Sequence, residues 1–195
     1  MINYTDHLFL LMKDIVARVP TLSFIDTSRL LVFARQDDFT GRVAHIRHLL
    51  GAIASPFNCW LALRGLRTLA CRVEAQSRTA MRVAQAMASH PAIERVHYPG
   101  LPTDPGHPIA AGQMSGFGGM IALRVRGGEA AAKRAAGRVQ IFTRATSLGG
   151  IESLLEHRRT SEGPGGQAPP ELLRLSIGLE HADDLIADLQ QALAD

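Results

Sequence analysis

The sequence predicts an α+β fold in which helices cover one face of an antiparallel sheet. Two observations carry this prediction. Short segments of apolar residues with strand-like spacing lie among amphipathic segments, and the two kinds do not alternate with the regular rhythm of strand–helix–strand units. The chain of 195 residues is also long enough to bury a core, and its composition of 46% hydrophobic and 20% charged residues is ordinary for a globular protein.

Helical spacing and capping residues define the helices. Asp37 or Asp38 caps the helix expected over residues 38–50. The longest helix, over residues 55–89, begins with Ser55 as its N-cap and Pro56 in its first turn, and we expect it to break near residues 69–71. The last helix has two aspartates, Asp183 and Asp184, in its first turn, where negative charge interacts favourably with the helix dipole. In chain order the expected helices span residues 1–19, 38–50, 55–89, 129–138 and 182–193.

Alternation defines the strands. In the last one, Leu173, Leu175 and Ile177 share one face, and Arg174 and Ser176 share the other. Glycine- and proline-rich loops separate the strands, and the loop over residues 99–112 leads into a helical turn. In chain order the expected strands span residues 30–34, 93–98, 120–125, 139–143 and 172–179.

The charge composition argues against a nucleic-acid partner. The formal net charge is only +3, and basic residues alternate with acidic ones along the chain. Nearly all the basic residues are arginines, because Lys13 and Lys133 are the only lysines in the sequence. Any mechanism that needs a lysine amine therefore has two candidates.

No membrane span is expected, because the N-terminal apolar run over residues 8–12 is too short and no basic region precedes it. Cys59 and Cys71 lie in a helical segment without a CxxC spacing. This pattern is typical of reduced, packed thiols in a cytoplasmic protein.

Arg174 admits two interpretations. It is either a solvated charge on an edge strand or a planar fork directed at an anion, for which a carboxylate is the best match. The turn over residues 147–150 contains two glycines that leave backbone N–H groups free to face an anion. If the turn and Arg174 converge, they form a carboxylate receptor. The spacing alone leaves that convergence open.

Other polar clusters have simpler explanations. His45 and His48 are three residues apart on a helix, but no third ligand is evident, so we expect no metal site. Glu152 and Glu156 are either acid–base groups or part of a polar helical turn. The glycine-rich segment 116–119 precedes a strand instead of opening a helix, which argues against a dinucleotide-binding loop.

Five motifs, in order, resemble the Cys/Met-metabolism group of pyridoxal-phosphate (PLP) enzymes: cystathionine γ-synthase, cystathionine β- and γ-lyases and methionine γ-lyase. The motifs begin with Ser-Pro-Phe-Asn-Cys-Trp and include Ser-Leu-Gly-Gly-Ile-Glu-Ser-Leu. The resemblance runs from residue 30 to the end of the chain. The segments that carry it are residues 55–66, 96–101, 114–120, 147–154 and the strand around Arg174.

The resemblance implies a domain organisation. Residues 91–195 correspond to the C-terminal small domain of a fold-type I PLP enzyme. Residues 55–90 are the long helical connector, and residues 30–54 are a remnant of the large cofactor domain. Residues 1–29 are an unrelated segment, which we expect to be helical and loosely anchored.

The resemblance also assigns roles. Arg174 binds the α-carboxylate of a sulfur amino-acid substrate, assisted by Ser147 and the backbone of Leu148. Thr146 occupies a position that bears on substrate preference. Whether the enzyme would be a lyase or a synthase stays open.

The cofactor machinery of the family is not evident in this chain. Family members carry a Schiff-base lysine shortly before the segment that matches residues 30–34, and neither Lys13 nor Lys133 has that context. Without an amine to form the aldimine, we expect no catalytic residue here and no binding of PLP by this chain alone. The sequence therefore indicates a truncated family member that is inactive alone and works as a homo-oligomer or with a split-enzyme partner. The alternative is a non-enzymatic interaction module that pairs with a full-length or split partner.

Overall fold

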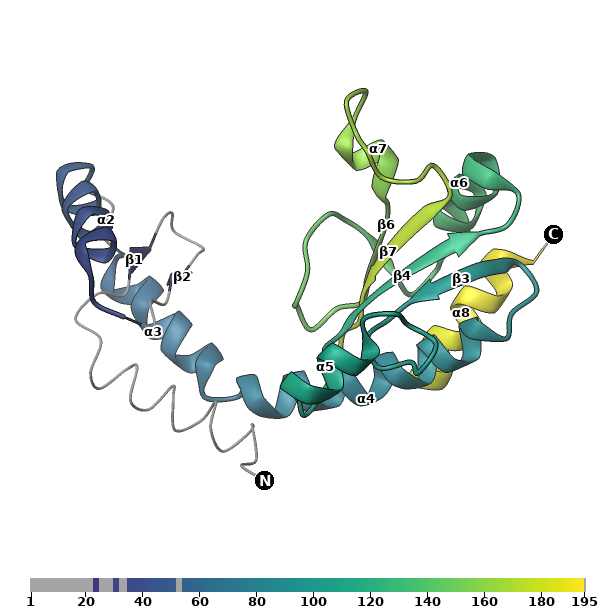
Figure 1. Cartoon of the computed structure of the whole chain (residues 1–195), viewed down its shortest axis with the longest axis horizontal. Coiled ribbons are helices and arrows are strands. Elements are labelled where there is room, and N and C mark those ends of the chain that lie inside the picture. The colour runs from purple at the N-terminus through teal and green to yellow at the C-terminus, as the bar shows by residue number, and fades with distance from the viewer. Residues whose placement is uncertain (1–22, 25–29, 32–34, 52–53, 195) are drawn as a thin grey trace. The chain divides into compact units, whose positions relative to one another are not determined.

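A computed structural model describes residues 23–24, 30–31, 35–51 and 54–194 (Figure 1). The chain divides into two compact units, residues 1–70 and 71–195. The helix expected over residues 1–19 lies outside the described residues. No helix among the described residues is both long and apolar enough to span a membrane.

Among the described residues of the first unit, two helices have the expected caps. The Asp37 carboxylate accepts the Thr40 N–H at 2.9 Å, and the Thr40 hydroxyl accepts the Asp37 N–H at 2.9 Å, which together form a capping box. Ser55 caps the second helix by accepting the Asn58 N–H at 3.2 Å. The described elements are β1 (Ser23–Phe24), β2 (Leu30–Leu31), α2 (Asp38–Leu49) and α3 (Pro56–Leu66).

The long helical segment is broken, as its sequence suggested. Helix α3 ends at Leu66 and α4 (Leu69–Ala88) begins after a turn at Arg67 and Thr68, slightly before the expected position. Most of α4 belongs to the second unit.

The second unit is built on a five-stranded mixed sheet with the order β3-β4-β7-β6-β5 (Figure 1). Neighbouring strands are antiparallel except β5 and β6, which are parallel, so the expectation of a purely antiparallel sheet is wrong at this edge. The strands are β3 (Ile93–His97), β4 (Met120–Val125), β5 (Thr143–Arg144), β6 (Leu154–His157) and β7 (Leu172–Ser176).

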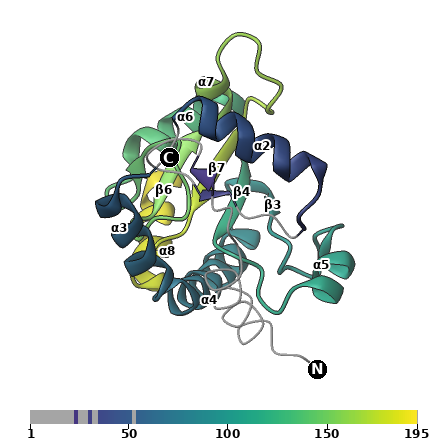
Figure 2. The same ribbon diagram turned by 90° about the vertical axis from the view of Figure 1, so that its left-hand side faces the viewer.

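Helices cover one face of this sheet, as expected (Figure 1 and Figure 2). Apolar side chains of α4, α6 (Gly128–Arg138) and α8 (Ala182–Leu193) pack against the inward residues of the strands in one core. Leu173, Leu175 and Ile177 are each at most 1% exposed, which confirms the alternation read from the sequence. Two short helices, α5 (His107–Gln113) and α7 (Arg158–Glu162), complete the unit.

The opposite face carries Arg174, and we call it the arginine face. Its central row is formed by Ala122, Arg174 and Glu156, which are successive cross-strand partners on β4, β7 and β6. Because β7 lies between β4 and β6, the interpretation of Arg174 as an edge-strand charge is wrong.

The strand expected over residues 139–143 is shorter than its sequence suggested. The buried carboxylate of Asp188 on α8 accepts the N–H groups of Gln140, Ile141 and Phe142 at 2.8, 2.8 and 3.1 Å. These groups are therefore unavailable to a neighbouring strand, and only Thr143 and Arg144 pair with β6. Burial alone would raise the pKa of the Asp188 carboxyl, but these three hydrogen bonds and one from Gln191 outweigh it, and the pKa is lowered.

Tyr98 offers a test of core packing. Its side chain is fully buried, its hydroxyl donates to the Gly118 carbonyl at 3.0 Å, and burial raises its pKa to about 12. We expect Tyr98→Phe to lower the free energy of unfolding by about 1 kcal/mol at neutral pH in urea titrations. Because an unfolded tyrosine ionises near pH 10, wild-type stability falls above about pH 10, whereas the variant lacks this loss. A variant as stable as the wild type at neutral pH would contradict the role of the hydrogen bond.

Candidate carboxylate-binding site

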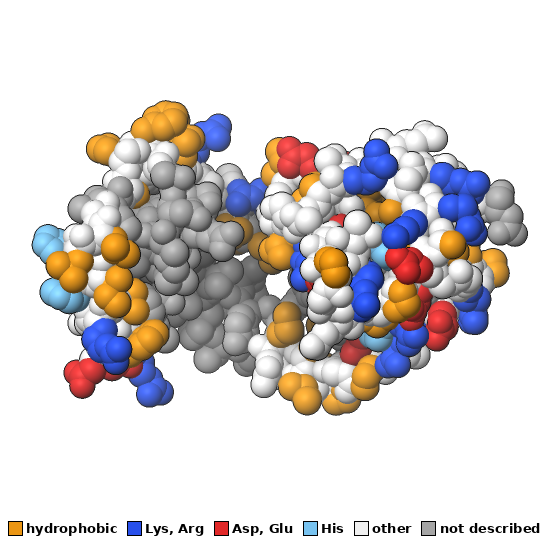
Figure 3. Space-filling model, turned by 90° about the horizontal axis from the view of Figure 1, so that it is seen from above, with side chains coloured by type: hydrophobic (Ala, Val, Ile, Leu, Met, Phe, Trp, Pro, Cys, Tyr) orange, Lys and Arg blue, Asp and Glu red, His pale blue; other side chains and the backbone are white. Residues whose placement is uncertain are grey.

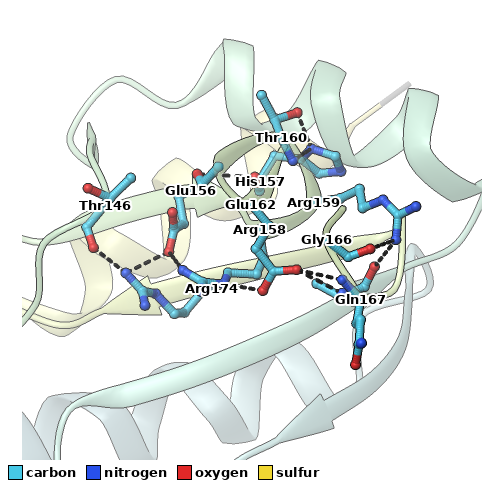
Figure 4. Close-up of polar contacts among 12 residues, drawn as sticks. Thr146, Glu156, His157, Arg158, Arg159, Thr160, Glu162, Gly166, Gln167 and Arg174 are labelled. Carbon is cyan, nitrogen blue, oxygen red and sulfur yellow. Dashed lines mark hydrogen bonds and ion pairs between the residues drawn. The ribbon is translucent and has the colours of Figure 1, made fainter. Parts of the chain in front are cut away.

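Arg174 lies in the middle of the sheet with its guanidinium on the arginine face. Its Nη2 atom lies 2.5 Å from Glu156 Oε1 and donates to the Thr146 carbonyl oxygen (Figure 4). The side chain is 23% exposed and thus only partly buried. The structure therefore brings Arg174 into contact with Thr146, the residue that precedes the turn over residues 147–150.

Glu156 contacts Arg174, which nothing in the sequence around either residue indicated. It lies in β6, so its assignment to a helical turn is wrong. Its side chain is only 4% exposed, and Oε1 also accepts a hydrogen bond from Arg158 Nη1 at 3.3 Å. The other oxygen, Oε2, is buried without a hydrogen-bond partner among the described residues.

Arg158 connects this pair to α7. Its Nε donates to Glu162 at 2.9 Å, and hydrogen bonds from Arg158 to Glu162 and then to Glu156 raise the pKa of the guanidinium (Figure 4). Glu162 in turn accepts the N–H groups of Ala168 and Gln167 at 2.9 Å, and the first of these bonds is the main cause of its lowered pKa. The ion pairs around Arg174 therefore extend into the loop before β7.

The turn over residues 147–150 lies on the arginine face. The Gly149 N–H donates to Ser176 Oγ at 2.9 Å, and the Gly150 carbonyl accepts Gln76 Nε2 at 2.7 Å. Ser147 and Leu148, at the tip of the turn, are exposed, and their N–H groups donate no hydrogen bond within the described part of the chain. Hydrogen bonds thus hold residues 149–150 of the turn in place, whereas residues 147–148 are exposed and their N–H groups are unpaired among the described residues.

The segment after the turn is locked against the end of β7. Ser153 Oγ accepts the Gly178 N–H at 2.8 Å and donates to Glu180 at 2.6 Å. A Cβ atom on Gly178 would lie 2.3 Å from the carbonyl oxygen of Ile151. Only glycine permits this approach, so Gly178 fixes where the turn returns to the sheet.

The remaining candidates lie apart from this cluster. His157 contacts Thr160 Oγ1 through Nδ1 at 2.7 Å and the Pro170 carbonyl through Nε2 at 2.6 Å. No group of three or more histidine, cysteine, aspartate or glutamate side chains suited to a metal occurs among the described residues. Cys59 and Cys71 are both exposed, so the prediction of packed thiols is wrong.

The described residues do not fit PLP. Their only lysine, Lys133, is 52% exposed on α6 and forms an ion pair with Glu129 at 2.6 Å. It lines a cavity of about 410 Å³ with Arg144 and Thr146, but Arg174 does not line that cavity. A paired ammonium at the surface differs from the free amine that aldimine chemistry needs.

Comparison with known proteins supports the family resemblance that the motifs indicate. The model of the Cys/Met metabolism PLP-dependent enzyme family matches residues 29–194. The cystathionine gamma-synthase of Mycobacterium leprae is 47% identical over 148 residues, which are 73% of this chain and 38% of that protein. The cystathionine gamma-lyase of Dictyostelium discoideum is 40% identical over 167 residues, covering 80% of this chain and 43% of the relative.

A solved structure shows the same fold. The crystal structure of metB from Corynebacterium glutamicum matches with a TM-score of 0.77 and 41% identity, over 82% of this chain and 43% of that one. This chain therefore spans about two fifths of the length of the proteins it matches. The extent and identity of these matches show that the chain belongs to the family of Cys/Met metabolism PLP-dependent enzymes.

Proposed function

We propose that this chain provides the carboxylate-binding small domain, with its helical connector, of a cystathionine γ-synthase- or lyase-type enzyme. The reaction would be a PLP-dependent β- or γ-elimination or replacement on a sulfur amino acid. The observation that carries the proposal is the position of Arg174, on the central strand and next to a turn with unused N–H donors.

In this proposal Arg174 binds the substrate α-carboxylate. A guanidinium matches a carboxylate in charge and planar geometry, and the Ser147 hydroxyl and the Leu148 N–H add neutral donors at the exposed end of the turn. Thr146 holds Arg174 through its carbonyl, and its exposed side chain is positioned to influence substrate preference. Residues 91–195 form the small domain, residues 55–90 the connector and residues 30–54 a remnant of the large domain.

The amine that PLP needs would come from outside these 195 residues. Lys133 is engaged with Glu129, and the sequence around Lys13 lacks the family's context. A split-enzyme partner or a full-length relative would supply the lysine, the cofactor site and the reacting centre. The chain alone would then be inactive, and its natural setting would be a cytoplasmic assembly, either a homo-oligomer or a complex with that partner.

The second candidate is a non-enzymatic interaction module. Its support is the apolar surface of α2 and α3, where none of the apolar side chains is buried (Figure 3). Phe57 stacks on Trp60 there, with ring centroids 6.0 Å apart. Exposed apolar patches mark interaction surfaces. The large side chains most exposed there are Phe39, Ile46, Leu49, Leu50, Phe57 and Trp60.

The two candidates differ in what the chain does when a cofactor domain is supplied. The chain would be mixed with PLP and a fragment of the Mycobacterium leprae relative that ends where the match begins, and turnover of a sulfur amino acid measured. We expect turnover only in the mixture, and we expect Arg174→Leu to lower kcat/KM by about 100-fold, because a charge-assisted carboxylate contact is lost.

Arg95→Leu is the matched control, since Arg95 is an exposed arginine on the edge strand β3. We expect this variant to retain wild-type turnover in the mixture. Binding of the fragment without turnover would favour the interaction module. Turnover by the chain alone, or a borohydride-trapped adduct on one of its lysines, would contradict the proposal.

A further inference from the structure

We infer that Glu156 is an internal carboxylate that competes with a bound carboxylate for Arg174 and thereby sets the affinity of the site. The inference rests on the proposed function of Arg174 and concerns a residue to which that function gives no role. It follows from three features of the described residues: the contacts of Nη2, the balance of charge and the unpaired oxygen of Glu156.

The contacts of Nη2 limit how Arg174 can bind a ligand. A guanidinium offers a carboxylate two bidentate edges, Nη1 with Nη2 and Nε with Nη2, and both include Nη2. In this structure Nη2 lies 2.5 Å from Glu156 Oε1 and donates to the Thr146 carbonyl. A second carboxylate therefore has to displace one of these oxygens, or accept a single hydrogen bond from Nε or Nη1.

The charges around Arg174 cancel. Glu156 lies between Arg174 and Arg158, and Arg158 also pairs with Glu162 at 2.9 Å. Two guanidinium groups thus face two carboxylates, and an incoming carboxylate meets a neutral cluster instead of an isolated positive charge. Because Glu156 is 4% exposed, water screens its effect on Arg174 only weakly.

The contact is nevertheless exchangeable. Glu156 Oε2 has no hydrogen-bond partner among the described residues, so this carboxylate is only partly satisfied in its present position. Arg158 Nη1 lies 3.3 Å from Oε1 and can hold the charge of Glu156 when Arg174 turns to a ligand. Glu156 therefore occupies Arg174 in the absence of ligand, and a substrate carboxylate displaces it.

The experiment is a titration of the whole chain with acetate, followed through the NMR signal of the Arg174 Nε–H. We expect E156Q to bind acetate about tenfold more tightly than the wild type, because the competing charge is removed and the side chain keeps its shape. R158Q should have the opposite effect, since Glu156 then has only Arg174 as a cation. Arg174→Leu removes the reporter guanidinium, so binding by that variant is followed through the backbone N–H signals of Ser147 and Leu148. This substitution should abolish the specific binding on both the wild-type and the E156Q background.

Glu171→Gln is the matched control, because Glu171 is a buried carboxylate that pairs with Arg124 instead of Arg174. It should leave acetate affinity unchanged. Equal or weaker acetate binding by folded E156Q overturns the inference and leaves the role of Arg174 intact. If E156Q does not fold, R158Q decides, and binding no weaker than wild type overturns the inference. Absence of any Arg174-dependent binding in wild type and E156Q overturns the proposed function as well.

Discussion

Replacing Gly178 with alanine is expected to lower the free energy of unfolding by about 3 kcal/mol, near the upper end for overpacking a buried position. The new Cβ would lie 2.3 Å from the Ile151 carbonyl oxygen and 2.6 Å from the carbonyl carbon of Glu152. These backbone atoms have little freedom to move, since the Ile151 carbonyl accepts the Leu179 N–H at 2.8 Å. Urea denaturation measures the loss, and the NMR signals of residues 147–150 should shift because the return of the turn is displaced.

Gly137→Ala is the matched control for this change. Gly137 lies near the end of α6, and a Cβ atom built there meets nothing within 4 Å. Alanine favours the helix over glycine by up to about 1 kcal/mol, so this variant should be as stable as the wild type or slightly more stable. If Gly178→Ala behaved like Gly137→Ala, the close approach of the two segments would be wrong.

Removing the Asp188 carboxylate is the second change with a large expected effect. Asp188→Ala leaves three backbone N–H groups and the Gln191 amide without their acceptor, and we expect a loss of about 3 kcal/mol in the free energy of unfolding. Asp188→Asn keeps one oxygen acceptor of the same shape and should lose less. Equal stability of Asp188→Ala and the wild type would contradict this role.

The lowered pKa of Asp188 gives this prediction a pH dependence. A carboxyl whose pKa is lower in the folded state than in the unfolded state stabilises the fold above its unfolded pKa of about 4. That contribution is lost as the pH falls through the folded pKa. The stability difference between the wild type and Asp188→Asn should therefore be full at about pH 6 and smaller at about pH 3. A difference that stays constant over this range would show that the Asp188 charge is not responsible.

The sequence predicts those elements whose signals are local. Strand β4 (Met120–Val125) and helix α8 (Ala182–Leu193) have the bounds expected from alternation and from acidic residues in the first helical turn. The cap at Ser55 and the alternation around Arg174 are equally local. Elements that depend on distant residues were not recoverable. Asp188 takes the N–H groups of residues 140–142, and nothing near those residues in the sequence indicates it.

In the candidate site too, some features have local sequence signals and others depend on residues far apart in the sequence. The order of the motifs pointed to Arg174 and to the turn, and the structure brings the Thr146 carbonyl to the guanidinium. The partnership with Glu156 follows from the antiparallel register of β6 and β7, which pairs residues 18 positions apart in the numbering. Because Glu152 and Glu156 also have helical spacing, the sequence left acid–base groups and a polar helical turn open as alternatives, and no local signal indicated the strand.

Because β5 and β6 pair in parallel, substitutions in the segment that connects them have different consequences from substitutions in the strands themselves. The chain must cross the sheet between these strands, and its crossing segment places Gly149 against Ser176 on the arginine face. Both ends of the crossing are fixed by strand pairing, while Ser147 and Leu148 at its tip are exposed. In evolutionary terms, substitutions at the exposed tip can accumulate without disturbing the register of the sheet. The sequence of the tip can therefore diversify independently of the stability of the sheet.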